Sequence, residues 1–126
     1  MTKLPDVAVK ALSAGKPVVL ATCSSDGVPN AIWASCCKLL DDGRFVIADN
    51  YFDKTRANIL ENPKVAVTAL ADGVGSVQIK GTVARLTEGP EYEDMLTWVS
   101  ENHPRKAACV ISIDEVWNGS KDIGCD

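Results

Sequence analysis

Short apolar runs separated by turn signals constrain the fold of this chain more than any other feature. The segments SSDG, DDG and DGVG each interrupt runs rich in residues that favour β-strands. Runs of this length joined by tight turns predict antiparallel strands, and closing such a sheet into a small barrel would remove its open edges. We expect six strands, which cover residues 17–23, 29–40, 44–49, 64–71, 76–87 and 106–113.

The run at 76–87 has the clearest strand pattern. Val77, Ile79 and Val83 alternate with polar residues, which predicts one buried face and one face toward water. Gly81 occupies a position of the buried series. A glycine inside a strand indicates either a bulge or the close approach of another backbone.

Three short helices are expected, at the beginning, in the middle and near the end of the chain. The segment DVAVKALSAG after Pro5 predicts a helix that stops at Gly15. Residues 54–61 predict a second helix, which an Asn-Pro dipeptide ends. GPEYEDMLTWVSEN has apolar residues at helical spacing and predicts the third. Beyond the last strand we expect an irregular tail that contains Trp117.

Composition and charge exclude several classes of function. The net charge of -4 and the pI of about 4.9 argue against a general binder of nucleic acid or anionic membranes, because both need a basic surface. The apolar runs are far shorter than the ~20 residues that span a bilayer. The N-terminal segment lacks the apolar core of a signal peptide. We therefore expect a cytoplasmic protein that binds neither nucleic acid nor membranes.

The cysteines and the single histidine indicate no metal site. The cysteines are Cys23, Cys36, Cys37, Cys109 and Cys125. Their odd number and the lack of CxxC spacing fit neither a disulfide framework nor a zinc knuckle, so we expect reduced, partly buried thiols. Cys36 and Cys37 are adjacent in an expected strand, so their side chains should point to opposite faces. His103 precedes Pro104 in an expected loop, without a cysteine or carboxylate cluster beside it.

The start of the helix at 54–61 carries an unusual set of charges. Lys54, Thr55 and Arg56 lie where a helix exposes unpaired backbone N–H groups. One explanation is structural, with Asp53 as the N-cap and the two cations in water. Cations oppose the helix dipole here, however, and a phosphate would supply the missing negative charge. It would accept hydrogen bonds from the backbone, the Thr55 hydroxyl and the Lys54 ammonium. The sequence alone leaves both explanations open.

The segment PNAIWASCCKLL places Trp33 in the middle of a long expected strand. Trp33 either packs in the core or on the surface, or it flanks a flat aromatic ligand together with the backbone of this strand. The chain shows no Ser/His/Asp arrangement, no paired catalytic carboxylates and no P-loop. Any chemistry must therefore be carried by a cofactor.

The order of these features resembles the FMN-binding split barrel of the pyridoxamine 5'-phosphate oxidase-like superfamily, and especially its short bacterial FMN-binding proteins. The resemblance covers about residues 5–117. It rests on AIWAS, the turn DKT, the short helix followed by NP, and VQIKGTVARL followed by GPE. It implies a mainly β fold, which is a six-stranded antiparallel split barrel with Greek-key-like connections and about three short helices. A single domain over residues 1–126 is expected.

The resemblance also implies where FMN would bind. By position in the family pattern, Lys54 and Thr55 would bind the FMN phosphate. Ala31, Ile32 and Trp33 would lie along the isoalloxazine ring, largely through backbone contacts.

Further positions follow from the same resemblance. Asp49, Asn50 and Tyr51 would line the ribityl chain and the ring edge. Family members are homodimers with FMN in a groove between the subunits. This implies that Trp117 and Asn118 in the tail cap the FMN of the partner subunit.

The implied function is that of an FMN-binding flavoprotein, which acts in electron transfer or as a flavin reductase-like oxidoreductase. NADH, NADPH or a redox partner protein are the candidate electron donors. Pyridoxamine phosphate oxidase activity is not expected, because those enzymes carry a basic C-terminal segment for the substrate phosphate and the ending IDEVWNGSKDIGCD has no such segment. Asp53 also stands where that branch often has serine. The alternatives are the same barrel with a deazaflavin or haem, and a non-catalytic interaction module.

Overall fold

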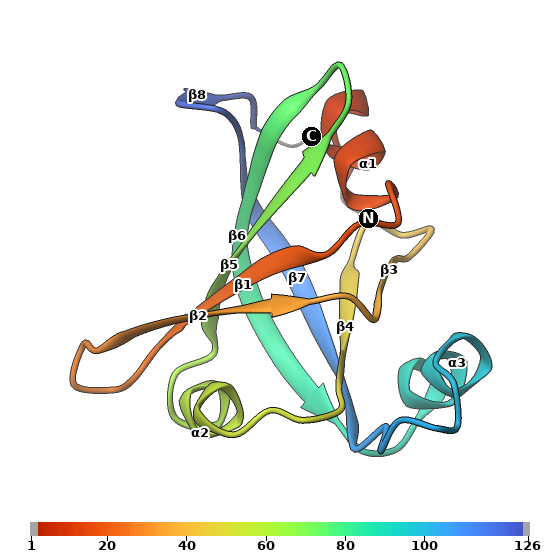
Figure 1. The fold of residues 1–126 in the computed structure, drawn as a ribbon. Helices are drawn as coiled ribbons and strands as arrows, with labels where there is room; N and C mark the ends of the chain where they lie inside the picture. The colour runs from red at the N-terminus through yellow and green to blue at the C-terminus, as the bar shows by residue number, and fades with distance from the viewer. Residues whose placement is uncertain (1–2, 125–126) are drawn as a thin grey trace.

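A computed structural model of the chain describes residues 3–124, which form eight strands and three helices (Figure 1). The strands are β1 (Val18–Cys23), β2 (Pro29–Ala34), β3 (Cys37–Leu39), β4 (Phe45–Asp49), β5 (Lys64–Ala71), β6 (Gly75–Leu86), β7 (Ala107–Asn118) and β8 (Lys121–Asp122). The helices are α1 (Asp6–Leu12), α2 (Lys54–Glu61) and α3 (Pro90–Trp98). None of the helices in this part of the chain is long and apolar enough to cross a membrane.

The strands form one curled antiparallel sheet in the order β2-β1-β5-β6-β7-β4-β3, with β8 paired to β7. β6 and β7 are the longest strands, at 12 residues each, and Figure 1 shows them crossing the molecule side by side. β2 and β3 are neighbours in sequence but lie at opposite ends of this order. The chain therefore joins the two edges of the sheet, and the sheet curls into the expected split barrel.

Two differences from the sequence prediction raise the number of strands from six to eight. The run at 29–40 is divided into β2 and β3, with Ser35 and Cys36 between them. β2 pairs with β1 whereas β3 pairs with β4, so the run bends where it leaves one partner for the other. The prediction of an irregular tail is also wrong, because β7 continues to Asn118 and β8 folds back on it. Both differences depend on which strands pair, and the hydrophobic pattern of the sequence does not indicate strand pairing.

The expected irregularity at Gly81 is confirmed. The pairing of β6 with β7 shifts register between Lys80, which faces Glu115, and Gly81, which faces Ile113. A Cβ atom on Gly81 would lie 2.1 Å from the carbonyl oxygen of Ser112. The position is therefore both a bulge and a close approach of two backbones, and only glycine fits it.

The core is divided into two clusters by the sheet. The larger cluster fills the barrel and includes Leu20, Phe45, Ile47, Ile79 and Ile111. The smaller cluster lies between α3 and the outer side of the sheet and consists of Val46, Ala48, Met95, Val99, Ala108 and Val110. β4 contributes alternate residues to both clusters and is buried along its whole length. The strand is apolar on both faces because both faces are covered.

The cysteines of the described region are free thiols, as expected. Cys36 packs against the smaller cluster and Cys37 against the larger one, so the two side chains do point to different sides. Burial raises the pKa of Cys109 to about 12, and burial together with Cys36 raises that of Cys37 to about 11. Both thiols are therefore protonated at neutral pH and weak as nucleophiles. Cys125 lies outside the described residues.

Candidate cofactor site

A groove with two exposed aromatic side chains lies between the end of β2 and the segment that follows β4. Its volume is about 320 Å³. The residues of this aromatic groove are Ile32, Trp33, Ala34, Ser35, Cys36, Ala48, Asn50, Tyr51, Phe52 and His103. Trp33 and Tyr51 are 72% and 71% exposed, although both carry large apolar surfaces. Aromatic surface left open to water in this way indicates contact with a ligand or with another molecule.

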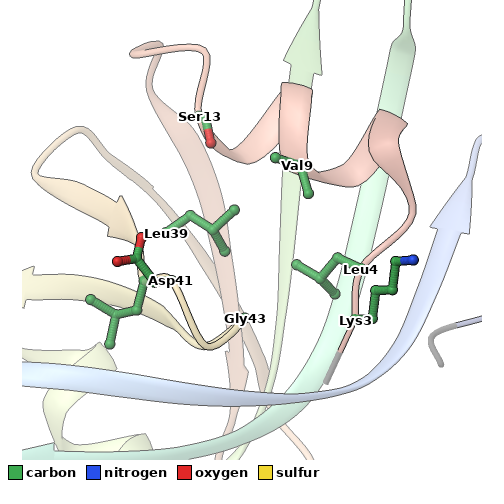
Figure 2. A pocket seen from close by; sticks show the side chains of 8 residues that line it. Lys3, Leu4, Val9, Ser13, Leu39, Asp41 and Gly43 are labelled. Carbon is green, nitrogen blue, oxygen red and sulfur yellow. The ribbon is translucent and has the colours of Figure 1, made fainter. Parts of the chain in front are cut away.

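A larger cavity of about 640 Å³ lies elsewhere, between α1 and the turn after β3 (Figure 2). Its lining residues are Lys3, Leu4, Val9, Ser13, Leu39, Leu40, Asp41 and Gly43. The polar side chains Lys3, Ser13 and Asp41 are solvent-exposed, whereas a ligand site places a few polar groups where they converge. It also contains none of the predicted cofactor residues. The aromatic groove is therefore the candidate site.

A buried ion cluster ties together the structure behind the groove. Asp49 at the end of β4 is fully buried. Its carboxylate accepts hydrogen bonds from Nε and Nη2 of Arg56, at 2.9 and 3.2 Å, and from Nε of Arg85, at 3.0 Å. The backbone N–H of Phe52 donates a further bond at 3.1 Å. Burial alone would raise the pKa of Asp49, but these hydrogen bonds outweigh it and hold the pKa below its usual value.

This cluster settles the position of Arg56, which the sequence left open. Two guanidinium groups surround one carboxylate, so the cluster carries one excess positive charge. Arg56 lies in the first turn of α2 and Arg85 lies near the end of β6. Their ion pairs with Asp49 therefore fix both elements to the end of β4. The Asp49 carboxylate is committed to this role and does not line the groove.

The start of α2 differs in one respect from the sequence prediction. Asp53 occupies the N-cap position, but its side chain makes no capping hydrogen bond. Its ψ of -82° lies outside the extended region from which N-cap side chains reach the free N–H groups. The explanation in which the Asp53 side chain caps the helix is therefore wrong. Lys54 is exposed and forms no ion pair with any residue in the described range.

Thr55 is buried at the start of α2 and lies in a polar network that the sequence did not reveal. Its Oγ1 atom accepts a hydrogen bond of 3.0 Å from Nδ2 of Asn30 on β2. Asn58, one helical turn later, donates to Oγ1 of Thr22 on β1 at 3.0 Å. α2 is thus held against β1 and β2, and Lys54 lies exposed in its first turn. Only spatial proximity links these residues, so no sequence spacing could have identified Asn30.

The structure brings four of the predicted cofactor residues together in the groove. Ile32 and Trp33 line it from β2, and Asn50 and Tyr51 line it from the segment after β4. Ala31 is exposed on β2 and does not line the groove.

The remaining predicted residues lie outside the groove. Lys54 and Thr55 follow the groove residue Phe52 closely and start α2. Trp117 and Asn118 lie at the far end of β7, whose first residue, Ala107, pairs with Asp49. Ten residues of strand extend over roughly 30 Å, so these two side chains do not reach the groove of their own chain.

The curled antiparallel half-barrel, with a groove at one edge and a basic helix start beside it, defines a small split barrel with a candidate cofactor site. A family model described as pyridoxamine 5'-phosphate oxidase matches residues 4–120, and the chain belongs to this family. The resemblance deduced from the sequence is therefore confirmed. The family description names a set of related chains and does not by itself assign the oxidase reaction to this one.

Three proteins are similar to this chain in sequence or in fold. The chain is 40% identical, over 94% of its length and 82% of the relative's, to an uncharacterized protein of Methanocaldococcus jannaschii. It is 33% identical to the FMN-binding protein of Nitratidesulfovibrio vulgaris, over 71% of this chain and 80% of that protein. The crystal structure of HupZ from Group A Streptococcus shares the fold with a TM-score of 0.83 and 24% identity, covering 96% and 98% of the two chains.

Proposed function

We propose that this protein is an FMN-binding flavoprotein, with the ring system of FMN in the aromatic groove and its phosphate at the start of α2. The observation that carries the proposal is the continuity of these two places. Residues 50–52 line the groove, and Lys54, two residues later, presents an ammonium group without a partner among the described residues. A flat ring joined to a phosphate needs this combination. The relative named as an FMN-binding protein supports the choice of FMN.

The groove suits the ring in shape and in polarity. Trp33 and Tyr51 offer exposed aromatic faces for stacking, and most of the other lining residues are apolar. Asn50 and His103 place polar atoms among them. Ligand sites are typically apolar with a few placed polar groups that set orientation.

The electrostatics of α2 suit the phosphate. The cluster around Asp49 holds one more cation than anion, and Lys54 adds a second positive charge at the same helix end. The first backbone N–H groups of α2 have no partners within the helix and point away from its start. The exposed Asp53 carboxylate makes no capping hydrogen bond, and its charge acts on Arg56 and offsets one of these positive charges. The helix start keeps one net positive charge.

We further propose a homodimer in which a second copy covers the exposed Trp33 and Tyr51. Trp117 and Asn118 lie too far along β7 to contact their own groove, so in this arrangement they reach the FMN of the partner. Bound FMN supplies the electron-accepting group. The residues of the chain bind the ring, orient it and exclude water from it. The proposed role is electron transfer or flavin reduction, with NADH, NADPH or a redox protein as donor.

Replacing Lys54 with alanine is expected to weaken FMN binding by roughly ten- to a hundredfold, because a charge-assisted hydrogen bond contributes about 1.5–3 kcal/mol. Riboflavin has no phosphate, so its affinity should stay unchanged. Both dissociation constants can be measured by the quenching of flavin fluorescence. Lys80→Ala, which removes an exposed lysine on β6, is the matched control and should affect neither ligand. Equal losses for FMN and riboflavin would contradict a phosphate contact.

A further inference from the structure

One residue that lines the aromatic groove, His103, has a side-chain nitrogen whose hydrogen-bonding capacity is unused. Nδ1 of His103 is buried and has no hydrogen-bond partner among the residues that the structure describes. It is the only buried side-chain nitrogen or oxygen in residues 3–124 in this condition. Buried polar atoms in folded proteins are nearly always paired, and each exception needs an explanation. A ligand that completes the pairing is one such explanation.

The loop that carries His103 is held firmly beside the groove. The N–H of Arg105 donates to Oδ1 of Asn50 at 3.0 Å, and the N–H of Lys106 donates to the carbonyl oxygen of Asp49 at 2.9 Å. Arg105 adopts a φ of +47°, in the left-handed region that residues other than glycine rarely occupy. Strained backbone persists where the surroundings enforce it, and it is concentrated at functional sites. The loop therefore presents His103 in a fixed position.

The contacts of the imidazole leave its buried nitrogen without a hydrogen bond among the described residues. Its ring meets Tyr51 edge to face, with 6.2 Å between ring centroids and 78° between planes. This contact uses ring carbon surface and gives the nitrogen atoms no partner. Asn50, the residue before Tyr51, also lines the groove, but its Oδ1 atom already accepts a hydrogen bond from the N–H of Arg105. His103 is thus the lining residue with a buried nitrogen still to be satisfied.

We propose that His103 is a ring-contact residue, whose Nδ1 hydrogen-bonds the polar edge of the isoalloxazine system. This inference rests on the proposed function and adds a contact to the ring rather than to the phosphate. The pyrimidine edge of a flavin offers carbonyl oxygens and one N–H group. A protonated Nδ1 can donate to the former and an unprotonated Nδ1 can accept from the latter, so either tautomer finds a partner.

The single histidine of the sequence makes this contact directly observable. In flavin-free protein without an affinity tag, only one imidazole contributes to the ¹⁵N NMR spectrum. Adding FMN or riboflavin should shift its Nδ1 resonance, and the two flavins should shift it alike because they share the ring. A flavin that binds, as shown by fluorescence quenching, without moving this resonance would overturn the inference and leave the proposed function standing. Failure of both flavins to bind would overturn both.

Two substitutions separate a ring contact from a structural role. His103→Phe keeps an aromatic ring against Tyr51 but removes both nitrogens, and it should weaken FMN and riboflavin by the same factor, roughly tenfold. His103→Asn restores a polar atom near the position of Nδ1 and should recover most of the affinity. Because Nδ1 has no partner among the described residues and phenylalanine keeps the ring against Tyr51, His103→Phe should not lower the melting temperature. Unchanged flavin affinity in His103→Phe, or a loss confined to FMN, would overturn the inference.

Discussion

Replacing Asp49 with asparagine is expected to lower the free energy of unfolding by about 3–5 kcal/mol, the usual cost of breaking a buried ion pair on one side. The carboxylate is fully buried, and the side chains of Arg56 and Arg85 are only 27% and 17% exposed. Without the negative charge, two guanidinium groups face each other in a largely buried place. Urea unfolding followed by circular dichroism measures the change.

The matched control is Asp72→Asn, which breaks the exposed pair of Asp72 with Lys16. Surface pairs of this kind contribute about 0–1 kcal/mol, so the control should be nearly neutral. Because the folded pKa of Asp49 is depressed, its contribution is present above its unfolded pKa, at about 4, and is lost as the pH falls through the folded value. Asp49→Asn should remove this part of the acid sensitivity. A small loss, comparable to that of Asp72→Asn, would show that Asp49 does not organise the cluster.

Replacing Gly81 with alanine should destabilise the protein by roughly 3 kcal/mol or more, and it should reduce the yield of folded protein. The new Cβ atom would lie 2.1 Å from the Ser112 carbonyl oxygen, which belongs to the backbone of β7. No side-chain rotation relieves a clash with backbone, so β6 and β7 must separate at their bulge. Urea unfolding measures this loss.

Gly27→Ala is the control for the effect of a methyl group alone. Gly27 lies in the turn between β1 and β2 with a φ of +91°, and a Cβ atom there would meet nothing within 4 Å. Its substitution carries only the conformational cost of about 1 kcal/mol. Equal destabilisation by the two substitutions would show that the close approach at Gly81 has no special weight.

The parts of the fold that sequence pattern predicted are those in which local chemistry dominates. α2 has the expected bounds because Asn62-Pro63 ends it, and β5 begins directly after that proline. The bulge at Gly81 was expected for the same kind of reason. The division of the run at 29–40 was missed, because β2 and β3 separate only to pair with different strands. Extension of β7 into the tail likewise depends on its pairing with β6.

In the candidate site, too, the sequence predicted some residues, whereas contacts between distant parts of the chain could not be predicted from it. The resemblance to the family singled out Ile32, Trp33, Asn50 and Tyr51, and the structure brings them together in one groove. The buried ion cluster could not be read from the chain, because Arg85 lies 36 residues from Asp49 and only the fold brings the two side chains together. The sequence places His103 in a loop without a cluster of metal ligands beside it. Its contact with Tyr51 depends on the fold, because the two residues are far apart in the chain.

The most direct test of the proposed function is a titration of flavin-free protein with FMN, followed by flavin absorbance and fluorescence. The aromatic groove and the basic start of α2 predict saturable binding with shifted flavin bands, and tighter binding of FMN than of riboflavin. Absence of saturable FMN binding by folded protein would contradict the proposal. Equal affinity for the two flavins would contradict the assignment of the phosphate to the start of α2.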